Sequence, residues 1–215
     1  MAGSITIEIV SDFVCPWCFI GSARLDEALA SRRVAAKLVH APFLLDPTVP
    51  DEGADLRAWL QARYGDPEPM VRRVEAVARE AGITIDFTKV RRHPSTLRAH
   101  TLMRLARERG DAHGLAKMLF GAYFGEGRDL GAMDVLIELG RQGGLDEAEM
   151  VRWLESRDER ERTRALARHE GITGVPVFFF QETDAAPGAK RLAVKGAQPL
   201  EVFTSLLERL APEAS

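Results

Sequence analysis

The chain contains two cysteines, and both lie in one short motif, Cys15-Pro16-Trp17-Cys18, between an apolar segment and a helical one. Two thiols separated by two residues can close and reopen a small disulfide, which makes them a reversible two-electron couple. At the start of a helix, unpaired backbone N–H groups and the positive end of the helix dipole favour a thiolate over a thiol. Pro16 and Trp17 shape the loop and carry no proton in the reaction. The motif therefore predicts thiol-disulfide exchange.

Zinc binding and a purely structural disulfide are the two alternatives for this cysteine pair. A structural zinc site has four ligands, usually with a second Cys or His pair at short spacing. The chain has no second cysteine pair, and its histidines are scattered, so we predict no metal site. The histidines are His40, His93, His100, His113 and His169. A bridge that closes so short a loop would add little chain-entropy stabilisation to 215 residues.

The composition of the chain gives no support to two classes of partner. It has 29 basic and 32 acidic residues, and the net charge of −3 leaves no electrostatic footprint for nucleic acid or an anionic membrane. With 46% hydrophobic residues the chain can bury a substantial core without disulfide bridges, so the cysteines are free to react. We therefore expect one compact unit with an inserted lobe, and neither nucleic acid nor membrane as a partner.

The N-terminal residues predict no targeting segment. Residues 1–4 are followed at once by an apolar strand, which leaves no basic region and no long apolar region of a signal peptide. No run in the chain approaches the roughly 18 uncharged apolar residues of a membrane span. We expect a cytoplasmic protein, and in that compartment a redox-active cysteine pair is more often catalytic than structural.

Three elements must position the cysteine motif. Residues 5–10 alternate apolar and polar side chains, which predicts a strand that ends shortly before Cys15. Apolar residues at near-helical spacing after the motif predict a helix of about fifteen residues. Residues 34–43, rich in Val, Leu and Ala, predict a second strand. The first part of the chain is therefore a strand, helix, strand unit.

The middle of the chain has a different pattern. From residue 51 to residue 154 the strand signals disappear and apolar stripes repeat at helical spacing. One such helix has Ser95 as its candidate N-cap and ends at Gly110. The sequence predicts an α/β fold in which residues 1–50 and 155–215 form a core and residues 51–154 form an inserted all-helical lobe.

The last part of the chain predicts a helix, two strands and a final helix. A highly charged helix near residues 156–169 precedes a β-branched and aromatic strand that follows Val175-Pro176. A turn at Pro187-Gly188 leads to a short partner strand over residues 192–195. Pro199 suits the first turn of the last helix.

Motifs spread over nearly the whole chain resemble the DsbA-like branch of the thioredoxin superfamily, and more closely the FrnE-type proteins. The motifs are Ser11-Asp12-Phe13-Val14 before Cys15-Pro16-Trp17-Cys18, then Ala122-Tyr123-Phe124, Glu126-Gly127, Gly174-Val175-Pro176 and Gly196-Ala197-Gln198. The resemblance implies a thioredoxin-like core with an inserted helical lobe.

The same resemblance implies a role for each active-site residue. Cys15 is expected to be the exposed nucleophile, and Cys18 the thiol that resolves the mixed disulfide. Pro176 is expected to be cis and to lie beside Cys15. In that place it would present the Val175 backbone to a substrate segment for strand-like pairing and would keep the two thiols from capturing a metal.

Two positions differ from the patterns of related proteins. Many thioredoxin-like enzymes carry a buried acid six residues before the first cysteine, but Ile9 stands there in this chain. The adjacent Glu8 should point to the other face of the strand, so no buried carboxylate relay is predicted. Segment 95–100 resembles one near the active site of relatives that usually begins with Asn, which leaves Ser95 and His100 as candidates to line the cleft.

A different function within the same superfold is the main alternative. 2-Hydroxychromene-2-carboxylate isomerases and kappa-class glutathione transferases resemble this chain in layout, but they carry serine where Cys15 stands and use bound glutathione. The two cysteines favour a dithiol-disulfide oxidoreductase without a cofactor beyond its own disulfide, with glutathione as a candidate co-substrate. Its substrates would be thiols or disulfides of proteins or small molecules. Redox direction, substrate identity and oligomeric state stay open.

Overall fold

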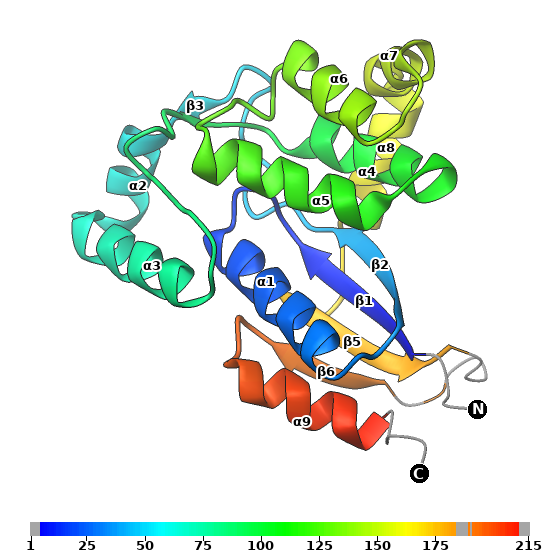
Figure 1. Cartoon of the computed structure of the whole chain (residues 1–215). Coiled ribbons are helices and arrows are strands. Elements are labelled where there is room, and N and C mark those ends of the chain that lie inside the picture. The colour runs from blue at the N-terminus through cyan, green and yellow to red at the C-terminus, as the bar shows by residue number, and fades with distance from the viewer. Residues whose placement is uncertain (1–4, 184–188, 190, 211–215) are drawn as a thin grey trace.

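A four-stranded sheet with strand order β2-β1-β5-β6 forms the centre of the fold (Figure 1). Strand β1 (Ile5–Ser11) pairs in parallel with β2 (Ala36–Pro42) and antiparallel with β5 (Val177–Glu182). Strand β5 also pairs antiparallel with β6 (Leu192–Lys195). The first and third core strands are therefore neighbours, although more than 160 residues separate them along the chain.

The computed structural model describes residues 5–183, 189 and 191–210. The predicted turn at Pro187-Gly188 lies outside these residues. Within them, no helix is long and apolar enough to cross a membrane.

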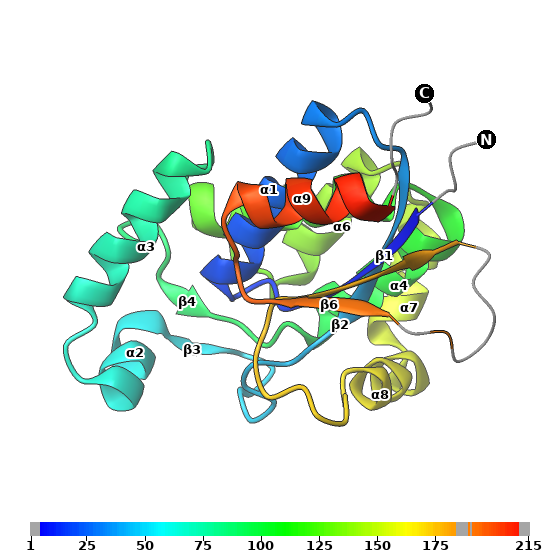
Figure 2. The same ribbon diagram turned by 90° about the horizontal axis from the view of Figure 1, so that it is seen from below.

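One face of the sheet is covered by two helices, α1 (Pro16–Ser31) and α9 (Leu200–Leu210), as Figure 2 shows. The alternation in β1 directs three isoleucines, each at most 1% exposed, into this layer. They pack with apolar residues of both helices and of β5 and β6. The cluster consists of Ile5, Ile7, Ile9, Leu25, Ala28, Phe178, Phe180, Val194, Phe203, Leu206 and Leu207.

Gly21 allows α1 to approach the start of β5 closely. A Cβ atom on this residue would lie 3.0 Å from the Phe178 ring and 3.2 Å from the Pro176 ring, closer than most Cβ contacts. A larger side chain would push the helix away from the strand. The glycine therefore helps to fix the distance between the cysteine-bearing helix and the loop before β5.

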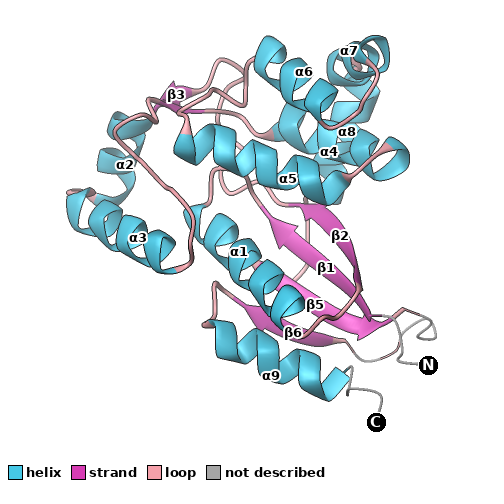
Figure 3. Cartoon of the chain, viewed as in Figure 1, coloured by secondary structure: helices cyan, strands magenta, loops and turns pink. Residues whose placement is uncertain are grey.

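The chain between β2 and β5 is mostly helical (Figure 3). It also contains a two-residue ladder that pairs β3 (Ala54–Asp55) with β4 (Arg92–His93), which the sequence pattern did not predict. The helical elements are α2 (Leu56–Tyr64), α3 (Glu68–Glu80), α4 (Leu97–Arg109), α5 (Ala112–Phe120), the π-helical turn η1 (Gly121–Gly125), α6 (Met133–Gln142), α7 (Glu147–Glu155) and α8 (Arg157–Leu166).

The helical region shares a hydrophobic core with the cysteine end of α1. Cys15 and Cys18 belong to the same buried cluster as residues of α2 to α7. Helix α8 packs on α4 and α7 and also contacts β2. The limits 51–154 for an inserted lobe stay our proposal, because α8 adjoins both the helical region and the sheet.

Several element ends differ from the sequence-based expectation. Strand β2 is shorter than the predicted 34–43, and α8 is shorter than the predicted 156–169. Helix α4 has Thr96 as its N-cap in place of Ser95, so the predicted cap is wrong by one residue. The predicted α/β fold, with a helical region between the two halves of the sheet, is confirmed.

Candidate active site

The cysteine motif begins helix α1. Cys15 is the N-cap residue, with extended backbone angles, and Pro16 occupies the first helical turn. Proline suits this place because the first N–H groups of a helix have no partner within the helix. The Cys15 N–H donates to the Asp12 carbonyl oxygen at 3.1 Å, and the Cys15 carbonyl accepts from the Cys18 N–H at 3.0 Å. The tight turn from β1 therefore sets both thiols at the start of the helix.

Both thiols are buried, and neither is in a disulfide. Cys18 is fully covered, and Cys15 is 4% exposed. The expectation of an exposed Cys15 is therefore wrong for this structure. The physical reason is its position at the N-cap, where the turn after β1 meets the loop before β5. The Cys15 Sγ lies 3.7 Å from the carbonyl oxygen of Val175, to which the thiol donates.

The loop before β5 brings Val175 and Pro176 to the cysteines, and their peptide bond is cis. The Pro176 carbonyl accepts from the Gly196 N–H at 2.8 Å, which fastens the loop to the turn after β6. Arg24 of α1 donates to the Ala197 carbonyl in that turn at 2.9 Å. These bonds tie the start of β5, the end of β6 and helix α1 to one another beside the thiols.

Burial raises the pKa of the Cys18 thiol well above its ordinary value, and a hydrogen bond with Cys15 and the charge of Cys15 raise it further. A hydrogen bond from the Asp12 backbone lowers this pKa, whereas the negative charge of the Asp12 carboxylate raises it. Cys18 therefore remains a thiol at neutral pH until a base accepts its proton.

A buried carboxylate lies beside the cysteines, which sequence reasoning missed. Asp12 is 1% exposed, and its two carboxylate oxygens have different partners. Oδ2 accepts from the Leu45 N–H at 2.7 Å, and Oδ1 lies 3.3 Å from His100 Nε2. The feature of the sequence that could have revealed this carboxylate is its place between a buried strand and the cysteine motif.

The remaining predicted site residues occupy different positions around the thiols. His100 is buried against Asp12 and against the Phe13 ring, with a centroid distance of 4.9 Å. Trp17 is half-buried on the side of α3, where the Arg73 guanidinium lies 5.9 Å from its ring centroid. Ser95 is half-buried and lies two residues before α4. The structure thus joins His100 directly to Asp12.

No group of three or more His, Cys, Asp or Glu side chains among the described residues is arranged to hold a metal ion. The site consists instead of two thiols, one buried carboxylate with its histidine, and a backbone carbonyl. Such a set can exchange disulfides and move a proton.

The chain matches a known protein family over nearly its whole length. The model of the DSBA-like thioredoxin domain matches residues 6–208. The chain belongs to this family. The protein YwbO of Bacillus subtilis (strain 168), described as uncharacterized, is 31% identical over 193 residues, which are 86% of this chain and 91% of that protein.

Two solved structures extend the comparison of this DSBA-like protein. A probable DsbA oxidoreductase from Streptomyces coelicolor has a TM-score of 0.83 and 32% identity, and the match covers 98% of this chain and 92% of that one. The cytosolic disulfide reductase DsbM from Pseudomonas aeruginosa, solved with GSH, has a TM-score of 0.63 and 17% identity, with 95% and 98% of the two chains covered. The second likeness shows a shared fold alone.

Proposed function

We propose that this DSBA-like protein is a thiol-disulfide oxidoreductase of the FrnE type, with Cys15 as nucleophile and Cys18 as resolving thiol. One observation carries the proposal: both thiols lie at the N-terminus of α1, with the Cys15 Sγ 3.7 Å from the Val175 carbonyl oxygen. The match to the probable DsbA oxidoreductase from Streptomyces coelicolor supports the same reaction class.

The reaction transfers two electrons between the cysteine pair and a substrate. In the reducing direction, the Cys15 thiolate attacks a substrate disulfide, whose S–S bond breaks and releases one substrate thiolate. Cys18 then loses its proton and attacks the Cys15 sulfur of the mixed disulfide. The Cys15–Cys18 bond forms and the second substrate thiolate leaves, so the substrate is reduced and the dithiol is oxidised. Substrate oxidation follows the same steps in reverse.

Asp12 is the group that we propose to accept the Cys18 proton. Asp12 lies in the turn that leads to the two thiols, where its carbonyl accepts from the Cys15 N–H at 3.1 Å, and its buried carboxylate contacts His100. Ile9, at the position where related proteins carry a buried acid, is fully buried and has no group that could take a proton. Asp12 therefore supplies from the β1–α1 turn the base that the strand lacks.

The substrate would meet Cys15 beside Val175. The Val175 carbonyl accepts from the Cys15 thiol, and we propose that the Val175 backbone pairs with an extended substrate segment. Because DsbM was solved with GSH, glutathione is the small thiol that we propose as co-substrate. DsbM is also named as cytosolic, and we propose the cytoplasm as the location of this protein as well.

A two-phase thiol assay tests the role of each cysteine. The reduced protein is mixed with dithiobis(nitrobenzoic acid), which releases a coloured thiolate when Cys15 attacks and a second one when Cys18 resolves the mixed disulfide. We expect two phases of equal amplitude. The Cys18→Ser variant should release only the first thiolate and accumulate the mixed disulfide on Cys15. The Cys15→Ser variant should lose the fast first phase.

The role assignment would be overturned if Cys15→Ser released its single thiolate at the rate of the wild-type first phase while Cys18→Ser reacted slowly. Equilibration of the wild type in glutathione redox buffers, followed by alkylation of free thiols, measures the potential of the pair and so its direction. An isomerase assay with and without glutathione tests the alternative function. Isomerase turnover that persists in Cys18→Ser would favour that alternative.

A further inference from the structure

Proton transfer at Cys18 is the step that the buried site makes difficult. Its thiol is fully covered, and so is the adjacent Asp12 carboxylate at 1% exposure. Resolution of a mixed disulfide requires the Cys18 proton to leave, and the reverse reaction requires one to return. A proton accepted by Asp12 must therefore still travel to solvent.

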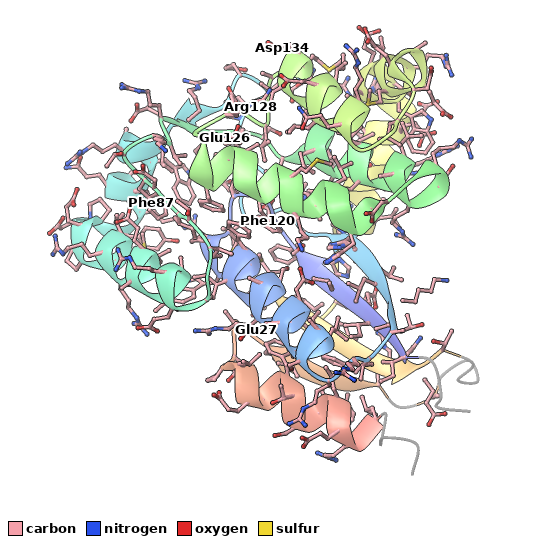
Figure 4. All side chains as sticks on the ribbon, viewed as in Figure 1. Glu27, Phe87, Phe120, Glu126, Arg128 and Asp134 are labelled. Atoms are coloured by element: carbon pink, nitrogen blue, oxygen red, sulfur yellow. The ribbon has the colours of Figure 1, made fainter. Side chains whose placement is uncertain are left out.

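A second carboxylate with two histidines lies on another side of α1. His113 of α5 places Nε2 at 2.8 Å from Asp26 Oδ1, and its Nδ1 lies 3.1 Å from Nε2 of His40 on β2. Asp26 and His113 are 22% and 24% exposed, so solvent reaches this end of the chain of contacts. They line a cavity of ≈ 170 Å³ between α1 and α5, together with Phe120, which Figure 4 shows between these helices.

The inner end of this group is a histidine with one unpaired nitrogen. His40 is 6% exposed, and its Nδ1 is buried without a hydrogen-bond partner among the described residues. With the His113 Nε2–H donating to Asp26, the His113 Nδ1 accepts from the His40 Nε2–H, and the His40 Nδ1 is left as an acceptor. A buried acceptor of this kind needs a donor to offset its loss of hydration.

A second, very small cavity connects this histidine with the active site. Its volume is ≈ 10 Å³, which is at the lower limit for holding one water molecule, and both His40 and His100 line it. Ser11 and Arg104 supply polar groups to the same cavity. His100 in turn contacts Asp12 at 3.3 Å. His40 and His100 therefore line the same small cavity, although apolar residues such as Met103 line it as well.

We propose that His100, His40 and His113 form a proton relay, with one water in the small cavity joining the first two. The relay runs from the carboxylate beside the resolving thiol to the partly exposed Asp26. It crosses four elements, from the β1–α1 turn through α4, β2 and α5 back to α1. The proposal rests on the proposed oxidoreductase function and adds the route by which the buried thiol exchanges its proton with solvent.

Each relay step moves one proton and no electrons. When the Cys18 thiolate forms, its proton passes to the Asp12 carboxylate. His100, as the tautomer with its hydrogen on Nδ1, accepts that proton at Nε2 and donates its Nδ1 proton to the water, which donates one of its own to the His40 Nδ1. His40 releases its Nε2 proton to His113, and His113 releases a proton through Asp26 to solvent. In the reverse reaction each proton moves in the opposite direction.

Burial, together with the charges that face His40, keeps it neutral between transfers. The pKa of His40 is lowered to about 3: burial is the largest cause, the charges of His113, His100 and Arg107 act in the same direction, and Asp26 opposes them. Arg107 also donates to the His40 carbonyl at 3.4 Å. A neutral imidazole can accept on one nitrogen and donate from the other, which is what a relay requires.

The two-phase thiol assay separates this proposal from the function on which it rests. The first phase reports attack by Cys15 and needs no relay. The second phase reports deprotonation of Cys18. In His40→Gln and in His113→Gln, an amide replaces the ring and keeps hydrogen bonding, but it does not pass protons as imidazole does. We expect an unchanged first phase and a second phase slowed about tenfold, less than the ~10²–10⁴-fold of direct acid–base catalysis.

A matched control and a second measurement exclude a merely structural effect. His169→Gln removes a histidine whose Nε2 lies 2.8 Å from the Pro42 carbonyl, outside the relay, and should leave both phases unchanged. In heavy water the second phase should slow more in His40→Gln than in the wild type, because proton transfer has become limiting. A wild-type second phase in both relay variants would overturn the relay. A missing first phase in the wild type would instead overturn the oxidoreductase function.

Discussion

One carboxylate lies in the turn before α1 and another on α1 itself. Each faces a histidine, but their surroundings differ. Asp12 is fully buried beside the cysteines. One of its carboxylate oxygens accepts from the Leu45 N–H, and the other contacts His100. Asp26 is partly exposed one and a half turns before the end of the helix, where it holds His113. The buried carboxylate is the group that we propose as the base for Cys18, and the partly exposed one is the group that we propose to exchange protons with solvent.

The largest expected effect comes from removing the buried carboxylate. Asp12→Asn keeps an oxygen that can accept from the Leu45 N–H but has no base for the Cys18 proton. We expect the second phase of the thiol assay to slow by ~10²-fold, within the range of direct acid–base groups. Asp26→Asn should slow the same phase far less. Equal slowing in the two variants would contradict the difference drawn between the carboxylates.

His40 should make stability depend on pH. Its pKa is about 3 in the folded state, mainly because of burial, and near 6.5 in the unfolded chain. Between these values the unfolded state binds more protons, so the free energy of unfolding should fall as pH decreases from 6.5 towards 3. One such group contributes a slope of about 1.4 kcal/mol per pH unit. Chemical denaturation at several pH values measures it.

The matching variant is His40→Gln, which should lose this part of the slope. His93→Gln is a useful comparison, because burial also lowers the pKa of His93, which stacks on Trp59 at a centroid distance of 3.9 Å. It should flatten the slope with the same sign and a smaller size. A slope unchanged in His40→Gln would show that this histidine does not titrate on unfolding.

Asp26 should contribute less to stability than His40. Its contribution comes from the charged form of the side chain, whereas that of His40 comes from the neutral form. Burial opposes the shift, but hydrogen bonds and charges from His113 and Lys117 lower its pKa below the ordinary 3.8. Its contribution is therefore present above pH 3.8 and is lost as pH falls through the folded value. Because the group is partly exposed, we expect Asp26→Asn to lose roughly 0.5–1 kcal/mol at neutral pH. The difference from wild type should shrink in acid, as measured by thermal unfolding.

The smallest effect is expected at Lys117. Its Nζ lies 3.0 Å from Asp26 Oδ2, but the side chain is 58% exposed, so water screens the ion pair. Lys117→Met should change the free energy of unfolding by less than about 1 kcal/mol. The second phase of the thiol assay should stay unchanged, because the Asp26–His113 contact remains. A marked slowing would mean that the lysine belongs to the proton path.

Local patterns were sufficient to predict much of the fold. The alternation in residues 5–10 predicted β1, and the apolar spacing after Cys15 predicted α1, because each pattern is set by the geometry of one element. Two-residue ladders such as β3 with β4 gave no such signal, since they are too short to show a period. The predicted N-cap of α4 was also wrong by one residue, because Thr96 and not Ser95 precedes the helix.

The cysteine pair and its place before a helix could be predicted from the sequence, because both are local features. What surrounds the pair depends on tertiary contacts. Cys15 is covered because the loop before β5 meets the turn after β1, and the Asp12 carboxylate is buried because His100 and Leu45 contact it from other parts of the chain. His40 and His113 are 73 residues apart, and only the packing of α5 on β2 joins them. Contacts of this kind depend on how elements pack, and no spacing along the chain encodes them.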